Sequence, residues 1–135
     1  MSATVSRSAQ FSALTVAYAG DPKEISAVRA DLRALLDGCP VGDEVILCAS
    51  ELAANAVRHS HSRLPGGYFT LRAKVSPGDF VRIEVEDGGG PWIEVGRDPD
   101  RGHGLDIIRA LASDWGIDGD RYGRVVWALL TWPGA

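Results

Sequence analysis

Apolar and polar residues alternate one by one along several segments of the chain, a pattern typical of half-buried β-strands. The segments with this alternation are 10–19, 68–76 and 80–87, and two last strands are expected over 115–118 and 123–132. The turn signal Pro77-Gly78-Asp79 joins two of them and predicts a β-hairpin. Another turn, Asp118-Gly119-Asp120, separates the last two strands.

Three other segments space their apolar residues three and four apart, which predicts helices. The first begins after its cap, Asp21, with Pro22 in the first turn, and ends at Gly38. The second is expected over 43–60, with Asp43 as its cap, and the third begins near His103.

The resulting order is one strand, two helices, two strands, a helix and two strands. Neighbouring strands without crossover helices predict an α+β fold. We expect a two-layer α/β sandwich, with a mixed, mostly antiparallel sheet and about three helices on one face. Residues 1–9 are small and polar, and are expected to form a flexible N-terminus before a single domain over 10–135.

Composition narrows the class of protein. The chain has 135 residues and a net charge of -4, so it lacks the basic surface of a nucleic-acid-binding domain. No apolar run approaches the length of a membrane span. The segment Ala17-Tyr18-Ala19 resembles a leader cleavage site, but polar residues interrupt the stretch before it, so a strand fits better. The two cysteines form no disulfide framework, and a cytoplasmic location is expected.

Glycine is over-represented and unevenly placed. Sixteen of 135 residues are glycine, and nine of these lie between Gly88 and Gly123. Glycine allows backbone to approach a ligand closely. This part of the chain is therefore the first place to look for a binding site.

The second predicted helix carries Glu51, Asn55 and His59 four residues apart. This spacing places a carboxylate, an amide and an imidazole on one slowly drifting face, largely opposite the apolar one. Such a stripe can meet a metal-bound polyanion. The alternative is an ordinary solvated helix face.

Asp87 ends an apolar strand and is followed by three glycines, the last of them Gly90. A carboxylate there can accept a hydrogen bond from an exocyclic amine such as that of adenine, while the glycines let a flat ring approach the main chain. The alternative is a glycine-rich turn in which the aspartate bonds to its own backbone.

The run Gly102-His103-Gly104-Leu105 opens the third predicted helix. Free amides at a helix N-terminus bind phosphate, and glycine permits close approach. Arg101 and His103 add positive or switchable charge. Each of these is also common in a solvated loop.

Taken together, the three motifs resemble those of the GHKL ATPase superfamily, whose members have the Bergerat fold. The N-box looks like Glu51-x-x-x-Asn55-x-x-x-His59, the G1 box like Asp87-x-Gly89 and the G2 box like Gly102-x-Gly104-Leu105. The stretch from Gly104 to Ala112, followed by Trp115-Gly116, is similar to small actinobacterial members related to anti-sigma-factor serine kinases.

The resemblance implies ATP and Mg²⁺ as cofactors. Asn55 would ligate the Mg²⁺, and Glu51 would act as the catalytic base. Asp87 would hold the adenine amine, with Gly89 under the ring. Residues 90–102 would form a lid over the nucleotide. The remaining residues expected to bind nucleotide are His59, Arg101, Gly102, His103, Gly104 and Leu105.

Two positions depart from the family pattern. Pro91 replaces the last glycine of the usual G1 box. Val125 stands where relatives often carry a threonine that helps to hold adenine, so an altered adenine contact is expected.

The resemblance implies an ATP-dependent serine/threonine protein kinase that acts as an anti-sigma factor. Its partners would be a sigma factor and an anti-anti-sigma protein of the STAS type, and such relatives are commonly homodimers. One alternative is a non-catalytic ATP-binding module whose nucleotide occupancy sets partner affinity. Another is a detached histidine-kinase catalytic domain, although the chain shows no phosphoacceptor helix pair.

Overall fold

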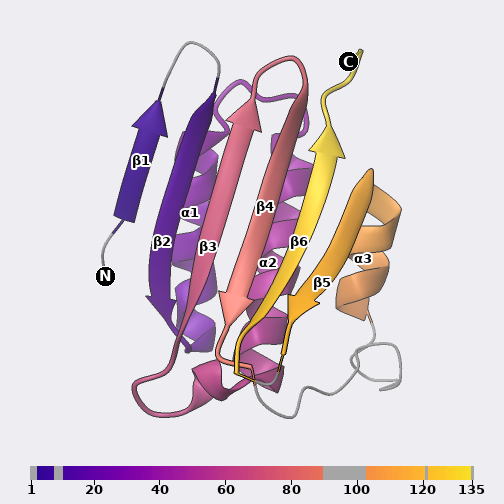
Figure 1. Ribbon diagram of the computed structural model, residues 1–135. Helices are drawn as coiled ribbons and strands as arrows, with labels where there is room; N and C mark the ends of the chain where they lie inside the picture. Colours follow the sequence, from indigo (N-terminus) through magenta and orange to yellow (C-terminus); the bar gives the residue numbers. More distant parts are fainter. Residues whose placement is uncertain (1–2, 8–10, 90–102, 121, 135) are drawn as a thin grey trace.

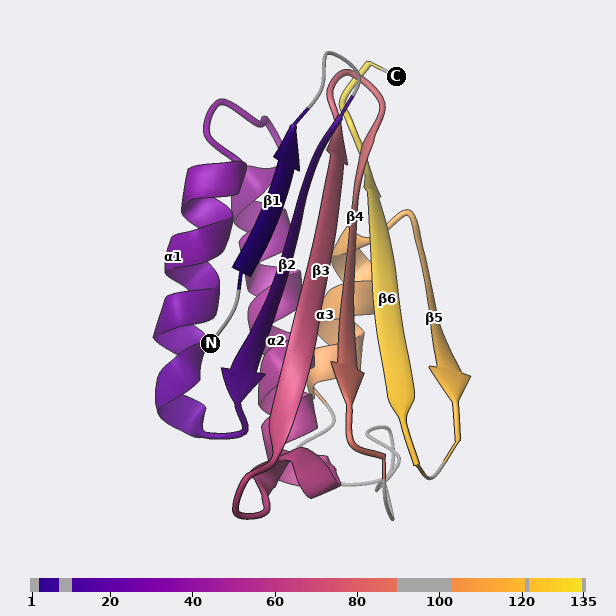
Figure 2. The same ribbon diagram turned by 60° about the vertical axis from the view of Figure 1, so that its left-hand side comes forward.

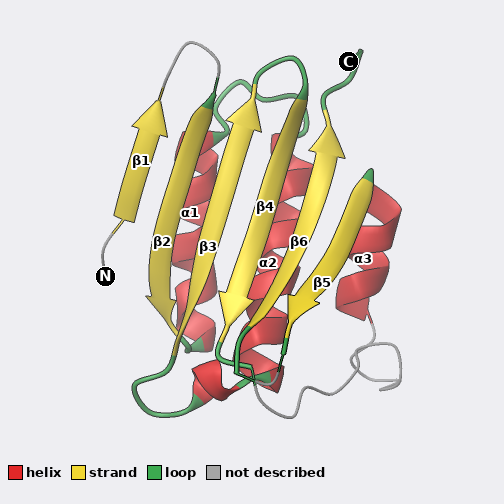
Figure 3. Cartoon of the chain, in the orientation of Figure 1, coloured by secondary structure: helices red, strands yellow, loops and turns green. Residues whose placement is uncertain are grey.

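A six-stranded sheet forms one layer of the molecule, and three helices cover one of its faces (Figures 1 and 3). The computed structural model describes residues 3–7, 11–89, 103–120 and 122–134. The strands are β1 Ala3–Arg7, β2 Ser12–Ala19, β3 Tyr68–Ser76, β4 Phe80–Asp87, β5 Asp114–Gly119 and β6 Arg124–Thr131. The helices are α1 Ile25–Leu35, α2 Gly42–His59 and α3 His103–Leu111, with short 3-10 turns η1 Pro22–Glu24 and η2 His61–Arg63.

The strands lie in the order β1-β2-β3-β4-β6-β5. Every pairing within the described sheet is antiparallel. The predicted α+β sandwich is therefore confirmed. The hairpin over 68–76 and 80–87 has the predicted bounds, and Gly78 adopts a φ of 80° in its turn, a conformation that glycine tolerates best.

The core lies between the helices and one face of the sheet. Because side chains alternate across a strand, every second residue of β2, β3, β4 and β6 is buried against the helices. Tyr18 of β2 is among them; it stacks on Phe69, and its hydroxyl donates a 2.6 Å hydrogen bond to Asp31 of α1. This bond ties the sheet to the helical layer while satisfying a buried hydroxyl.

The first two helices begin in different ways. Asp21 caps η1 as predicted, because its side chain accepts a hydrogen bond from the amide of Lys23. Asp43 is not a cap, because α2 already begins at Gly42. Asp43 lies in the first turn of α2, where a negatively charged side chain stabilises the helix by interacting with the positive end of its dipole. Among the described residues, no helix is both long and apolar enough to cross a membrane.

Strand β1 is the main departure from the expected fold. Residues 3–7, assigned to a flexible N-terminus in the sequence analysis, pair antiparallel with β2 from Ala3 opposite Val16 to Arg7 opposite Ser12. The described part of this strand is exposed, since Val5 keeps about half of its surface in solvent. Pairing along the edge of β2, rather than burial, forms the strand.

Candidate functional site

The three motifs meet at one end of the molecule. The C-terminal end of α2, the C-terminal end of β4 and the N-terminal end of α3 all lie at the lower end in Figures 1 and 2. Helix α2 packs against both β4 and α3. The fold therefore brings the predicted amide, carboxylate and helix N-terminus to a common region.

Asn55 is buried in α2, with 2% of its surface exposed. Neither its Oδ1 nor its Nδ2 atom has a hydrogen-bond partner in the described structure. An unsatisfied buried amide costs about 1–3 kcal/mol, so natural proteins rarely retain one without a reason such as an absent ion or ligand. This is the strongest sign of a binding site among the described residues.

The other two residues of the stripe differ in exposure. His59 is 8% exposed, whereas Glu51 is only partly buried. A solvated face is therefore the wrong interpretation for Asn55 and His59. The stripe runs from the partly exposed Glu51 into the interior.

Asp87 ends β4 on the buried face of the sheet, with 6% of its surface exposed. Its Oδ1 accepts a 2.7 Å hydrogen bond from the backbone amide of Gly89, and Gly89 has a φ of 70°. The alternative taken from the sequence is therefore confirmed, because the aspartate bonds to its own turn. The same turn fixes the direction of the carboxylate, and the adenine contact stays a prediction.

Two serines that the sequence analysis did not single out support this turn. Ser60 donates to the carbonyl of Ala56 in the last turn of α2 and accepts from the amide of Ser62. Ser62, which is also buried, accepts a 2.9 Å hydrogen bond from the amide of Gly88. The end of α2 is therefore connected to the glycine turn after β4 through two hydroxyls. Serine after a helix is a common loop residue, so the sequence offered no specific signal.

Arg124 was also missed. It lies directly opposite Asp87 in the β4–β6 pairing, so the two residues share a face of the sheet. Val125 lies opposite Glu86 and belongs to the other face. The residue beside Asp87 is therefore Arg124 rather than Val125, and the altered adenine contact stays a prediction. Strand alternation, counted back from the buried Val126, is the signal that could have revealed this.

Helix α3 supplies the last part of the region. It begins at His103 and includes Gly104, as predicted, and Leu105 is buried with 7% exposure. Arg101, Gly102 and Pro91 lie outside the described residues, as does the expected lid over 90–102. Their predicted roles are neither supported nor opposed by the structure.

The site fits a metal that is bound mainly by its substrate. No group of three or more metal-binding side chains occurs among the described residues. Mg²⁺ usually takes one or two protein ligands and fills its shell with water and phosphate oxygens. The unpartnered Oδ1 of Asn55 is a suitable oxygen donor for such an ion.

Cys48 lies in α2 one turn before the stripe and takes no direct part. Burial raises the pKa of its thiol to about 11, and the carboxylates of Glu44 and Glu51 add to this effect. The thiol stays neutral at physiological pH, consistent with a packing role.

Comparison with known proteins agrees with this geometry. A family profile described as "Histidine kinase-like ATPase domain" matches residues 14–130. Among solved structures, the chain is similar to the RsbU and RsbW domains of Rv1364c from Mycobacterium tuberculosis, with 22% identity and a TM-score of 0.67. The match covers 88% of this chain but 33% of the other, so this chain spans about a third of the length of the solved chain that it matches. No curated protein matches significantly.

Proposed function

Because the chain belongs to the family of histidine kinase-like ATPase domains, a membership that implies ATP binding, we propose that it is an ATP- and Mg²⁺-dependent serine/threonine protein kinase. The observation that carries the proposal is the buried, unpartnered amide of Asn55. It belongs to the C-terminal part of α2, which lies at the same end of the fold as the C-terminal end of β4, where Asp87 stands, and the start of α3. A nucleotide bound there would have an acceptor for its base, a metal ligand and helix amides for its phosphates.

Each residue has a separate task in this proposal. Asp87, already held by the Gly89 amide, would accept a hydrogen bond from the adenine amine through its remaining lone pairs. Asn55 would hold the Mg²⁺ through Oδ1, and the ion, when bound, would neutralise phosphate charge. The amides of Gly104 and Leu105 would contact phosphate oxygens.

Glu51 would act as general base. As the serine or threonine oxygen of a target protein attacks the γ-phosphorus, its proton passes to the Glu51 carboxylate and the bond to the β,γ-bridging oxygen breaks, releasing ADP. Partial exposure suits this role, because the side chain must meet a hydroxyl that comes from another protein.

We further propose that the targets are regulators of transcription. The resemblance of the three motifs to anti-sigma-factor serine kinases supports this, together with a fold shared with a chain that includes an RsbW domain. The protein would bind a sigma factor and phosphorylate an anti-anti-sigma protein of the STAS type. It would work in the cytoplasm as one domain that includes β1, with a homodimer as the assembly that the relatives suggest.

The test is phosphoryl transfer from Mg·ATP labelled at the γ-phosphate to STAS-type proteins from the same genome. The wild-type protein should label one of them on serine or threonine. Glu51→Gln should lose transfer and keep ATP affinity. The matched control, Glu44→Gln, changes an exposed carboxylate two turns earlier on the same helix and should keep both.

Three results would contradict the proposal at different points. Phosphoryl transfer that persists in Glu51→Gln would show that Glu51 is not the general base. If the protein binds ATP but transfers phosphate to no partner, it is not a kinase, and the alternative, a module whose nucleotide occupancy sets partner affinity, is favoured. If the wild-type protein does not bind ATP, the proposed nucleotide site is wrong.

A further inference from the structure

The hydroxyl of Ser62 is only partly used in the structure. Its Oγ atom accepts a 2.9 Å hydrogen bond from the amide of Gly88, and Ser62 is 1% exposed. Among the described residues, none accepts a hydrogen bond from this hydroxyl. Because buried hydroxyls normally have a partner for the proton as well as for the oxygen, a ligand that supplies an acceptor would complete this group.

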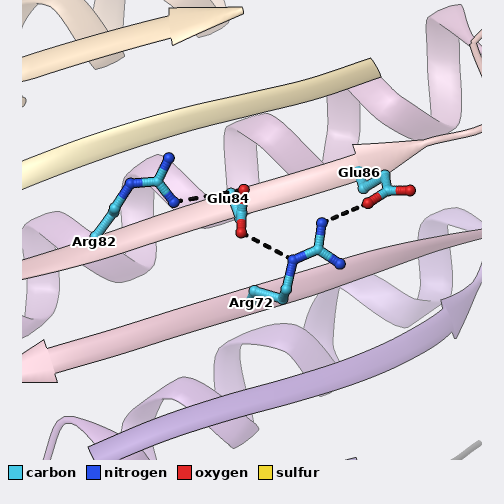
Figure 4. A network of polar contacts seen from close by, with 4 residues as sticks. All are labelled: Arg72, Arg82, Glu84 and Glu86. Atoms are coloured by element: carbon cyan, nitrogen blue, oxygen red, sulfur yellow. Dashed lines mark hydrogen bonds and ion pairs between the residues drawn. The ribbon is translucent and has the colours of Figure 1, made fainter. Parts of the chain in front are cut away.

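A cavity of about 220 Å³ opens beside Ser62 at the end of β4, in the region of the proposed nucleotide site. Glu86 and Thr70 line it from the open face of the sheet, where the Glu86 carboxylate pairs with Arg72 (Figure 4). Among the described lining residues, the buried polar side chains are those of Asp87 and Ser62. A base that enters the site would therefore meet one carboxylate and one hydroxyl.

Building on the proposed function, in which Asp87 accepts a hydrogen bond from the adenine amine, we propose that Ser62 donates its hydroxyl proton to N1 of the same base, directly or through one water. The amine and N1 are neighbours on the edge of the ring, the first a donor and the second an acceptor. An ionised carboxylate only accepts hydrogen bonds, so N1 needs a separate donor. Ser62 is thus a specificity-determining residue for the base.

The hydrogen bonds around Ser62 hold it in place for this task. Its amide donates to the Ser60 hydroxyl at 3.0 Å, and its Oγ is held by the amide of Gly88, the residue after Asp87. A donor that is fixed before the base arrives loses little conformational freedom on binding. Ser60 cannot take the same part, because its own hydroxyl already donates to the carbonyl of Ala56.

The test compares Mg·ATP with 1-deaza-ATP, in which a C–H group replaces N1 and the amine is kept. In calorimetric titration, the wild-type protein should bind ATP about tenfold more tightly than 1-deaza-ATP. Ser62→Ala should bind the two nucleotides with nearly equal affinity. Since each ratio is taken within one protein, a general weakening of the site through the lost Gly88 contact cancels, and a purely structural role would leave the ratio unchanged.

Two further variants accompany this comparison. Ser62→Cys keeps nearly the same side-chain size and substitutes a weak donor, so it should also lower the ratio, and it provides the readout if the alanine variant does not fold. Thr70→Val is the matched control, because it removes another hydroxyl from the cavity lining, on the open face. This variant should keep the wild-type ratio.

Purine riboside triphosphate, which keeps N1 and lacks the amine, tests the Asp87 contact separately. It should bind more weakly than ATP, by the same factor in the wild-type protein and in Ser62→Ala. Equal binding of ATP and 1-deaza-ATP by the wild-type protein, a wild-type ratio in both Ser62 variants, or a lost ratio in Thr70→Val would each overturn the role of Ser62 and leave the proposed function standing. A wild-type protein that binds no ATP would overturn both.

Discussion

Replacing Asn55 by alanine should stabilise the protein in the absence of nucleotide, whereas replacing most buried polar residues destabilises a fold. Removing an unsatisfied amide relieves a penalty of about 1–3 kcal/mol. Alanine is also a better helix former than asparagine, by about 0.5 kcal/mol. The smaller alanine side chain also leaves a cavity of roughly 40 Å³, which lowers the free energy of unfolding by about 1 kcal/mol.

The net expectation is a gain of about 1–2 kcal/mol in the free energy of unfolding. For a chain of 135 residues, that corresponds to a midpoint about 4 °C higher for each kcal/mol. Urea and thermal unfolding without nucleotide measure it directly.

Adding Mg·ATP should reverse the order of stability. The wild-type protein gains about 2.7 kcal/mol at a ligand concentration one hundred times its dissociation constant. Asn55→Ala lacks the metal ligand, so its affinity should fall about a hundredfold, and its gain at the same ligand concentration should shrink to about 0.4 kcal/mol. Calorimetric titration gives the two affinities independently of unfolding.

Ser50→Ala is the matched control. Ser50 is another buried polar residue of α2, but its hydroxyl donates to the Ile46 carbonyl and accepts from Arg29. Its loss should cost about 1 kcal/mol and leave ATP affinity unchanged. If Asn55→Ala destabilises the protein as Ser50→Ala does, or binds Mg·ATP normally, the interpretation of the buried amide is wrong.

Three further changes test other parts of the structure. Ser62→Ala leaves the Gly88 amide without its acceptor and should cost about 1–3 kcal/mol in urea unfolding, with weaker ATP binding by calorimetry. Gly20→Ala would put a Cβ 1.6 Å from the Ser62 carbonyl oxygen, so we expect a loss of 3 kcal/mol or more in urea unfolding, on the order of severe overpacking. Burial raises the pKa of both Tyr18 and Cys48, so the unfolded chain loses these two protons at lower pH than the folded protein does. The free energy of unfolding should therefore fall as pH rises above about 9. Urea unfolding at pH 8–11 measures this, and a flat profile would contradict it.

The parts of the fold that depend on local pattern could be predicted. The alternation over 68–76 and 80–87, with a glycine turn between, specifies both strands and their register. Strand β1 has no such signal, because an edge strand forms by pairing with β2 and need not bury a face. The place of β6 between β4 and β5 is likewise a non-local pairing that no short window of sequence contains.

The candidate site, like the fold, could be predicted from the sequence only in part. The spacing of Glu51, Asn55 and His59 predicts a shared helix face, but their exposure depends on what packs there. The polar stripe was expected opposite the apolar face, and it is instead largely buried because α2 contacts both β4 and α3. Spacing within one element could not supply that contact.

The end of β4 shows why the face of each residue matters more than its place in a motif. Asp87 and Arg124 lie on the helix side, while their neighbours Glu86 and Val125 lie on the open face. A shift of one residue in the strand register would exchange these sets, because side chains alternate with a period of two. The same short segment thus places the carboxylate of Asp87 on the helix side, in the proposed nucleotide site, and that of Glu86 on the open face, where it pairs with Arg72. Substitutions at Asp87 should therefore weaken nucleotide binding more than substitutions at Glu86, even though the residues are adjacent in sequence.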